Sequence, residues 1–269
     1  MKIVILYSSG LDSKIMYHLA KVKYPHADIK CIYYLHGAAS ENAEVSQLPD
    51  FVEMRTVDWL GDKIKPVAKK EDPFAGAIYI PGRNLIFSAL AACQELADEV
   101  WLGALADECN EKGTDKNEKF RNDTSELLSY VLSPFIDKVT VRFPFVEEGW
   151  TKVDSVKWAL ENGMSAEDIS ETVSCWHQTS EPCGQCKQCF KRQLVFRLNN
   201  LREICRQDPI ESDFGKEMIK GYVTTVMIDG SKNLDEVNVS KMILQLYNQG
   251  SFSSEIQQMI TQILGKIGK

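Results

Sequence analysis

The chain has 269 residues, of which 44% are hydrophobic and 26% are charged. This is the composition of an ordinary globular protein, and it excludes a disordered chain, a collagen-like repeat and a coiled-coil array. The formal net charge of −7 argues against long-range attraction to nucleic acid or to an anionic membrane. The sequence has no apolar run of about 18 residues, and its first apolar run is too short for a signal peptide. We therefore expect a cytoplasmic protein without a membrane span.

Short apolar runs alternate with stretches of helical periodicity through the first 163 residues. The expected strands are residues 2–7, 29–35, 51–57, 77–80, 99–103 and 138–143, and the expected helices are residues 11–23, 85–96, 121–132 and 152–160. Asn84 is expected to cap the helix over 85–96. This alternation predicts an α/β fold with a parallel sheet covered on both faces, which binds ligands at the carboxyl ends of its strands.

The first strand and the first helix are joined by Ser8-Ser9-Gly10-Leu11-Asp12-Ser13. Small residues let a ligand approach the backbone, and successive N–H groups at a helix start can bind phosphate oxygens. The hydroxyls of Ser8, Ser9 and Ser13 add donors, and Asp12 is a candidate ligand for Mg²⁺ beside phosphates. The spacing matches neither a Walker loop nor a dinucleotide-binding turn. The alternative is a well-capped helix start, since serine and aspartate favour that position.

Four of the eight cysteines fall within fifteen residues, at Cys175, Cys183, Cys186 and Cys189. Four soft thiolates at this spacing suit tetrahedral Zn²⁺, and Gly184 allows a tight turn between them. Because four protein ligands leave no open position, we expect a structural zinc and not a catalytic one. The alternative is a set of free thiols or redox pairs.

These patterns divide the chain into three expected parts. Residues 1–163 form the α/β domain that carries the phosphate-binding loop. Residues 164–205 form a zinc-binding helical subdomain. Residues 206–269 show only helical spacing and form a C-terminal helical extension.

Further motifs carry a resemblance to known proteins. Strand, Ser-x-Gly-x-Asp-Ser and helix together resemble the pyrophosphate loop of the PP-loop ATP pyrophosphatases, with Ser9 standing where that superfamily usually has glycine. Pro81-Gly82-Arg83-Asn84 lies at a strand–helix junction, and Pro144 precedes Thr151-Lys152 at the start of a later helix. With the cysteine cluster, these motifs in this order are similar to the 7-cyano-7-deazaguanine synthase family over residues 2–197.

The resemblance implies a Rossmann-like domain of the adenine nucleotide alpha hydrolase type with a zinc-bound helical subdomain, often as a homodimer. It implies a C–N bond-forming ligase that uses ATP with Mg²⁺ to adenylate the carboxylate of 7-carboxy-7-deazaguanine. Ammonia then displaces AMP to give an amide, and a second ATP activates the amide oxygen so that the nitrile forms.

The resemblance also assigns roles to single residues. It implies nucleotide binding by Ser8, Ser9, Gly10, Leu11, Asp12, Ser13, Arg83 and Gly103, and catalytic roles for Asp12, Ser13 and Lys152. From the residues alone, Arg83 is a surface ion-pair residue and Lys152 is a solvated lysine at a helix start.

The segment after the strand at 99–103 departs from the family, which usually has an Asp-x-Ser-Gly-Tyr-Pro-Asp-Cys-Arg-like stretch that holds the deazaguanine. Here residues 107–117 keep acids but lack the aromatic and arginine partners. Asp107 and Asp115 are the candidates to accept hydrogen bonds from the N–H groups of a guanine-like ring. The acid substrate and the nitrile or amide product stay open, and so does a solvated loop without a ligand.

Residues 206–269 exceed the usual family length, and we expect them to serve a dimer or partner interface or to cover the core. Three rival functions stay open: conjugation of an activated deazapurine to an amine of a protein or other acceptor, a PP-loop tRNA modification, and a non-catalytic zinc-stabilised binding module. The binding module predicts that Asp12 and Ser13 can be changed without loss of function.

Overall fold

The computed structural model describes residues 1–35, 41–57, 82–109, 115–172, 174–175, 181–203 and 205–266. The strand expected at 77–80 and Pro81 of the strand–helix motif lie outside the described residues. The chain divides into two compact units, the first formed by Met1–Trp150 with Glu171–Val173 and the second by Thr151–Ser170 with Ser174–Lys269.

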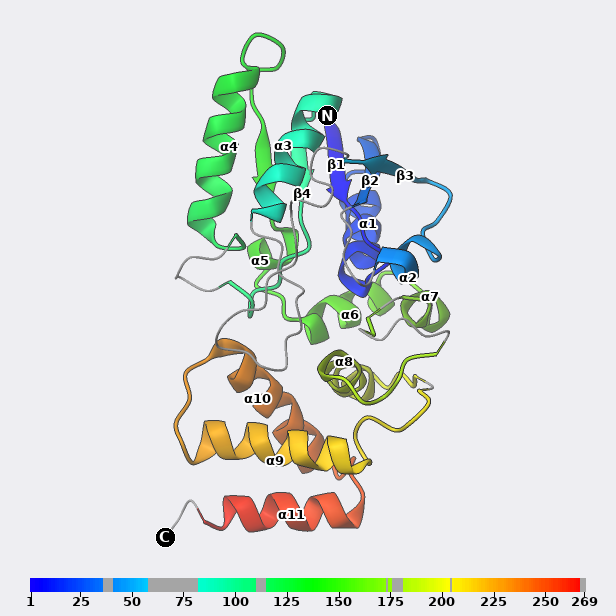
Figure 1. The fold of residues 1–269 in the computed structure, drawn as a ribbon, viewed down its shortest axis with the longest axis vertical. Helices are drawn as coiled ribbons and strands as arrows, with labels where there is room; N and C mark the ends of the chain where they lie inside the picture. The colour runs from blue at the N-terminus through cyan, green and yellow to red at the C-terminus, as the bar shows by residue number, and fades with distance from the viewer. Residues whose placement is uncertain are drawn as a thin grey trace. The chain divides into compact units, whose positions relative to one another are not determined.

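The first unit contains a five-stranded parallel sheet with helices packed on it, which is the Rossmann-like α/β class that the sequence predicts (Figure 1). Its elements are β1 (Lys2–Leu6), α1 (Leu11–Lys23), β2 (Asp28–Leu35), α2 (Glu41–Val45), β3 (Val52–Thr56), α3 (Arg83–Glu95), β4 (Glu99–Trp101), α4 (Glu118–Leu132), β5 (Thr140–Arg142) and α5 (Pro144–Glu147). The strand order is β3-β2-β1-β4-β5, and every neighbouring pair is parallel. The order reverses between β1 and β4, and ligands of such sheets bind at the carboxyl ends of the strands at this reversal.

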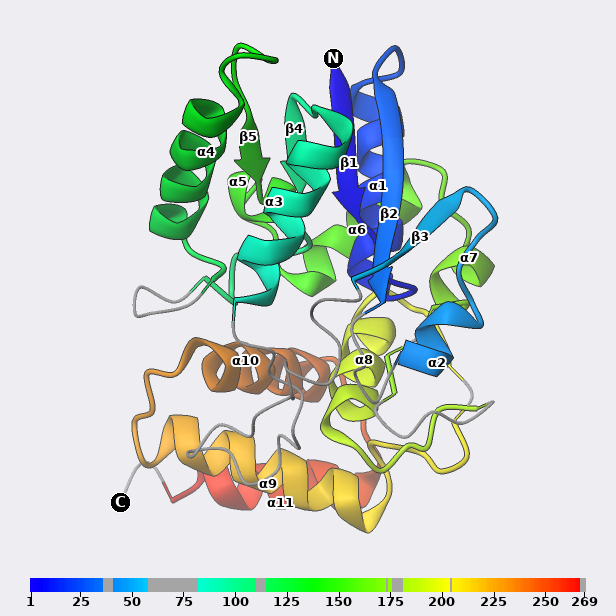
Figure 2. The same ribbon diagram turned by 45° about the horizontal axis from the view of Figure 1, so that its top comes forward.

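Both faces of the sheet are covered because its strands are apolar on both sides. Val4 of β1 lies in a cluster with Ala92 of α3 and Leu128 of α4. Ile3 and Ile5 point to the opposite face, where both are fully buried. Figure 2 shows α3 in front of the sheet and α1 behind it. The sheet is thus the middle layer of three, as the alternation of strands and helices predicts.

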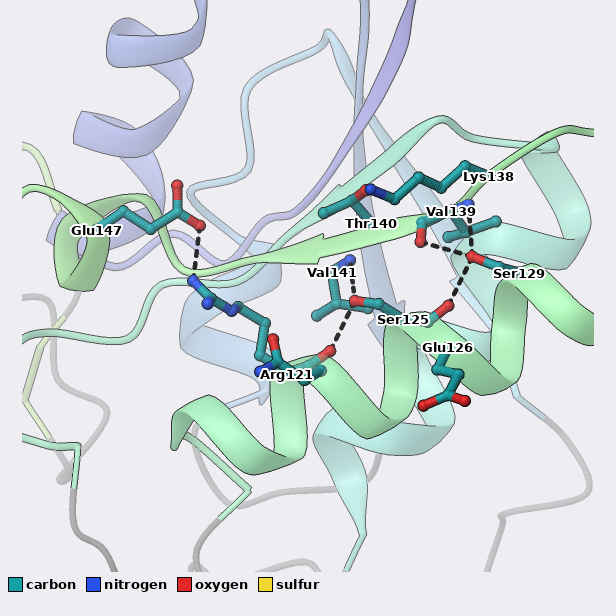
Figure 3. A pocket seen from close by; sticks show the side chains of 10 residues that line it. Arg121, Ser125, Glu126, Ser129, Lys138, Val139, Thr140, Val141 and Glu147 are labelled. Atoms are coloured by element: carbon teal, nitrogen blue, oxygen red, sulfur yellow. Dashed lines mark hydrogen bonds and ion pairs between the residues drawn. The ribbon is translucent and has the colours of Figure 1, made fainter.

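Helix α4 covers the free edge of the outer strand β5 (Figure 3). The Ser125 hydroxyl accepts a hydrogen bond from the Val141 N–H at 2.8 Å, and the Ser129 hydroxyl accepts one from the Val139 N–H at 3.0 Å. These serines satisfy N–H groups in and just before β5 that face away from β4, which protects the edge from pairing with another chain. A hollow of about 430 Å³ beside them follows the same edge.

The second unit is helical. Its elements are α6 (Lys152–Glu161), α7 (Ala166–Ser170), α8 (Lys187–Leu198), α9 (Asp213–Met227), α10 (Leu234–Asn248) and α11 (Ser254–Leu264). Phe190 of α8 packs in one core with Ile219 of α9, Ile243 of α10 and Ile260 of α11. The boundaries expected at residues 163 and 205 both fall within this unit, because the last three helices bury their apolar faces against α8 and one another.

The beginning of α3 differs from the expectation. Gly82 takes a left-handed conformation with φ 71° and stands at the N-cap, so Asn84 lies inside the first turn and does not cap the helix. The Asn84 side chain instead donates to the Asp115 carbonyl at 3.2 Å.

The short helices α2, α5 and α7 were not expected, since four or five residues give no readable periodicity. Within the described ranges, every helix is too short or too polar to cross a bilayer.

Candidate nucleotide and metal sites

The loop after β1 is closed by its own serines. Gly10 has an extended backbone and stands at the N-cap of α1. The Ser13 hydroxyl donates to the Gly10 carbonyl at 2.9 Å and also to the Ser8 carbonyl, while the Ser8 hydroxyl accepts from the Gly10 N–H at 3.3 Å. Leu11 anchors the turn, since it is only 2% exposed. The sequence-predicted residues from Ser8 to Ser13 therefore form one compact turn at the carboxyl end of β1.

Ser9 adopts an ordinary backbone conformation. Among the described residues other than glycine, a positive φ is found only at Leu96 and Asn200, so serine at this position carries no left-handed strain. Its hydroxyl donates to the Glu44 carbonyl of α2. The same Glu44 accepts a hydrogen bond from the Tyr33 hydroxyl at 2.9 Å through its carboxylate. Ser9 thus binds α2 through its side chain.

Asp12 and Gly103 lie close together beyond the ends of β1 and β4, the two strands between which the strand order reverses. Asp12 lies in the first turn of α1, after β1, and Gly103 follows β4 by two residues. A Cβ atom on Gly103 would stand 3.4 Å from the Asp12 Cβ atom. A side chain larger than alanine at this position would press on Asp12. The site therefore has room for one Cβ atom at ordinary van der Waals contact with Asp12.

Lys116 contacts the residues that follow β4. The Lys116 ammonium forms an ion pair with Glu108 at 2.7 Å, and the Cys109 thiol donates to the Lys116 carbonyl at 2.7 Å. Burial raises the pKa of the Cys109 thiol, which keeps it protonated at neutral pH. The two candidate base-binding acids are Asp107, which precedes Glu108, and Asp115, which precedes Lys116. Both are partly buried.

Arg83 is the first residue of α3 and is partly buried. Its charge reaches the Tyr33 hydroxyl at the end of β2, where it opposes a rise in the Tyr33 pKa that comes mainly from burial. Arg83 and Tyr33 thus interact electrostatically, and the nucleotide-binding role of Arg83 stays a prediction. Lys152 is the first residue of α6 in the second unit, after Thr151, whose side chain forms a capping box with Asp154.

Sequence reasoning passed over Glu44 and Tyr33. No strand or helix was expected around Glu44, but this residue joins the Ser9 hydroxyl to the Tyr33 hydroxyl. Neither residue belongs to a motif of recognisable spacing. The contact depends on α2 lying beside the loop, which the tertiary fold alone decides.

The four clustered cysteines meet in space at the start of α8. The Sγ atoms of Cys175, Cys183, Cys186 and Cys189 all lie within 4.8 Å of one another. The Cys186 and Cys189 sulfurs are 3.5 Å apart, and those of Cys183 and Cys189 are 4.0 Å apart. Zinc–sulfur bonds of about 2.3 Å in a tetrahedron place sulfurs about 3.8 Å apart. The donor set and its spacing therefore fit a zinc ion.

The backbone around the cluster is shaped for thiolates. The Gln185 N–H donates to the Cys183 sulfur at 3.3 Å, and the Cys183 N–H donates to the Cys175 sulfur at 3.4 Å. Gly184 takes a φ of 72°, and a Cβ atom there would overlap the Gln207 carbonyl. Burial raises the pKa of Cys183 to about 11, so a bound cation is needed to hold this thiolate at neutral pH. The structure thus supports a metal site of four thiolates, the arrangement of a structural zinc.

The comparisons with known proteins agree with these motifs. The family described as Queuosine biosynthesis protein QueC matches residues 2–200 of the chain. The chain belongs to the QueC family. The match includes the loop after β1, the cysteine cluster and α8, and it ends before α9–α11.

Curated relatives of this QueC family member are proteins named 7-cyano-7-deazaguanine synthase. The protein from Nitratiruptor sp. is 25% identical over 73% of this chain and 94% of its own length. The protein from Pseudoalteromonas translucida is 24% identical over 78% of this chain and 98% of its own length. The protein from Methanocaldococcus jannaschii is 21% identical over 76% of this chain and 97% of its own length.

Among solved structures, the U34-tRNA thiolase NcsA from Methanococcus maripaludis with its [4Fe-4S] cluster aligns with 91% of this chain and 71% of that chain. The TM-score is 0.35 and the sequence identity is 12%. This likeness is too slight to support a conclusion about the QueC family member described here.

Proposed function

We propose that this protein is an ATP-dependent, AMP-forming ligase that activates the carboxylate of a deazapurine, 7-carboxy-7-deazaguanine, for attack by nitrogen. The product is 7-cyano-7-deazaguanine or the related amide. Membership of the QueC family and relatives named 7-cyano-7-deazaguanine synthase support this proposal. The observation that carries it is the serine-closed turn from Ser8 to Ser13 at the point where the strand order reverses.

The chemistry needs a good leaving group on the carboxylate. Transfer of AMP to the carboxylate oxygen expels pyrophosphate, and nitrogen then displaces AMP. The expelled pyrophosphate is best stabilised by donors and cations that are already in place. We place the pyrophosphate at the start of α1, because the first N–H groups of a helix favour anions. The Ser8 hydroxyl accepts from the Gly10 N–H and the Ser13 hydroxyl donates to the Gly10 carbonyl, and these bonds hold the turn in shape.

Three charged residues complete the proposed nucleotide site. Asp12 is the carboxylate placed to hold Mg²⁺, because it lies in the first turn of α1 beside the side-chain-free Gly103. A bound Mg²⁺ supplies positive charge to the phosphate oxygens. Arg83 and Lys152 are proposed as phosphate contacts, in keeping with the family's motifs, and Lys152 is proposed as a catalytic cation.

Asp107 and Asp115 are proposed to accept hydrogen bonds from the deazaguanine ring. Asp107 precedes Glu108 and Asp115 precedes Lys116, so the Glu108–Lys116 ion pair joins the two stretches of chain that carry these acids. The Asn84 amide binds the Asp115 backbone and thereby fixes this segment to the start of α3. The segment lacks the aromatic and arginine residues usual in the family, so an activated acid that is passed to a different amine is the main alternative outcome.

The test is ATP–pyrophosphate exchange by the zinc-loaded protein with 7-carboxy-7-deazaguanine and a panel of other acids. We expect exchange with the deazapurine acid, reduced about 10²-fold or more in Asp12→Asn, which keeps the volume of the side chain. Asp123→Asn is the matched control, because Asp123 is an exposed acid on α4 that pairs with Lys119. Product analysis with ammonia distinguishes the nitrile from the amide. Exchange with no acid, or full exchange in Asp12→Asn, contradicts the proposal.

A further inference from the structure

The hydroxyl of Ser9 bonds outside the loop that the neighbouring serines close. The Ser8 and Ser13 hydroxyls bond within the turn, to the Gly10 N–H and the Gly10 carbonyl. The Ser9 hydroxyl instead donates to the Glu44 carbonyl of α2. The loop after β1 is thus held in shape by its own serines and joined to a second element by Ser9.

Glu44 stands at the end of α2, where carbonyl groups need partners. The helix spans Glu41–Val45, and the last four carbonyls of a helix have no partner within it. The Glu44 carbonyl accepts from the Gln47 N–H at 3.2 Å and from the Ser9 hydroxyl. The glycine that the PP-loop superfamily usually has at the position of Ser9 has no hydroxyl to donate. The serine of this chain therefore adds a bond between the loop and α2.

The side chain of Glu44 extends this contact to β2. Its carboxylate accepts a hydrogen bond from the Tyr33 hydroxyl at 2.9 Å, and Tyr33 lies on β2, the strand that pairs with β1. Ser9 is 4% exposed and Tyr33 is 3% exposed, so water does not readily replace a lost partner of either hydroxyl. A path of hydrogen bonds thus runs from the loop through Glu44 to the neighbouring strand.

We propose that Glu44 is a positioning residue for the nucleotide loop, which it holds against β2 through Ser9 and Tyr33. The inference rests on the proposed function, since it takes ATP to bind at this loop. A loop that is already held in place loses less conformational freedom when a ligand binds, so the path raises the affinity for ATP. By linkage, bound ATP stabilises α2 by the same factor.

The experiment measures the dissociation constant of ATP with Mg²⁺ for the full-length, zinc-loaded protein by equilibrium dialysis. We expect Tyr33→Phe to raise this constant about fivefold or more, because a buried bond to a carboxylate is lost. Tyr34→Phe is the matched control. Tyr34 is also 3% exposed and donates to the Gln94 side chain at 3.0 Å, but it follows Tyr33 on the strand and so faces the other side of the sheet. Tyr34→Phe should leave ATP binding unchanged.

A change at the other end of the path tests whether the two bonds act together. Ser9→Ala should weaken ATP binding, and the double variant Ser9→Ala/Tyr33→Phe should bind no more weakly than the weaker single variant, because either change breaks the same path. Ser46→Ala is the control for the serine. The exposed Ser46 hydroxyl also donates to a carbonyl of α2, that of Ala43 at 2.9 Å, but the bond does not reach the loop. Additive losses in the double variant contradict the proposal.

Hydrogen exchange separates positioning of the loop from a general loss of stability. The Gln47 N–H donates to the Glu44 carbonyl and the Leu48 N–H donates to the Val45 carbonyl, each at 3.2 Å, so these two amides report on the end of α2. We expect ATP to slow their exchange about fivefold in the unaltered protein and to have no such effect in Tyr33→Phe. The same protection by ATP in both proteins overturns the proposal.

The outcomes distinguish this inference from the proposed function. An unaltered protein that binds ATP no more weakly than Tyr33→Phe retains the proposed function and loses the positioning role of Glu44 only if both bind with equal affinity or the variant binds more tightly. An unaltered protein that binds no ATP contradicts the proposed function and this inference with it. If Tyr33→Phe does not fold, Glu44→Gln is compared with Glu44→Ala. Glutamine keeps an acceptor for the tyrosine hydroxyl and should lose less affinity than alanine, and equal losses overturn the proposal.

Discussion

Arg192 of α8 is a buried charge of the second unit with several hydrogen-bond partners. Its side chain is 4% exposed and forms an ion pair at 2.7 Å with Glu203, whose side chain is 6% exposed. The guanidinium also donates to the Ser174 hydroxyl at 3.0 Å and to the carbonyls of Ile169 and Ser170 at 3.2 and 3.1 Å. One side chain thus joins α7, the cysteine cluster and the segment after α8.

Replacing Arg192 with methionine keeps most of the side-chain volume and removes the charge. Breaking a buried pair by removing one partner costs about 3–5 kcal/mol, because the other charge stays buried without compensation. The carbonyls that lose their donor add to this cost, but such contributions are not additive. We expect Arg192→Met to lower the free energy of unfolding by about 4 kcal/mol. The double variant Arg192→Met/Glu203→Leu should recover more than half of this loss, because it removes the stranded carboxylate.

The pH dependence gives an independent check. Burial raises the pKa of Glu203, and the Arg192 charge opposes that rise. In Arg192→Met the opposition is lost, so the folded state binds a proton at Glu203 more tightly than the unfolded state does. Stability conferred by a raised carboxyl pKa is present at low pH and lost as the pH rises through the folded-state pKa. Arg192→Met should therefore be less destabilised at pH 5 than at pH 7.

The assay is urea unfolding of the zinc-loaded protein by far-ultraviolet circular dichroism, with hydrogen exchange of the α8 amides as a local reading. Arg202→Met is the control, because Arg202 is exposed and its loss should change stability by no more than about 0.5 kcal/mol. A loss below about 1 kcal/mol in Arg192→Met would refute the reasoning. So would a double variant that is as unstable as the single one.

Three further predictions concern the sheet edge, the cysteine turn and an exposed ion-pair group. Ser129→Ala leaves the Val139 N–H without its acceptor and should destabilise the first unit by about 1–3 kcal/mol in urea unfolding. Ser133→Ala, at an exposed position after α4, is the control and should have little effect. Equal effects of the two changes would contradict the edge-covering role. Gly184→Ala should weaken zinc retention during dialysis against a chelator more than Gly163→Ala does. Both glycines have a positive φ, but only Gly184 lies against a backbone carbonyl. Equal zinc retention in the two variants would mean that only the backbone strain of a positive φ matters. Hydrogen bonds from Arg55 and Lys30 lower the pKa of Glu53 to about 2, so its stabilising effect is present above pH 4.5 and lost as the pH falls toward 2. Because Glu53 is 44% exposed, this effect should be about 1 kcal/mol, and the stability difference between the unaltered protein and Glu53→Gln should shrink over that range; a constant difference would contradict the assignment.

The local features of this protein were available from its sequence. The apolar run of β1, the small polar turn that follows it and the helical spacing of α1 predict an α/β start with a compact turn, because each depends on neighbours within a few residues. The cysteine spacing gave the metal site for the same reason, since the three cysteines from Cys183 to Cys189 lie on one turn and the start of one helix. The motif order also gave the family.

Contacts between distant segments were decided only by the tertiary structure. Periodicity identifies which face of a helix is buried but not what covers that face, so the core shared by α8 and α9–α11 could not be read from the sequence. The same limit applies to the Ser9 hydroxyl on the Glu44 carbonyl and to the Arg192–Glu203 pair. Each is a polar contact between residues that packing brings together, and no spacing in the sequence encodes it.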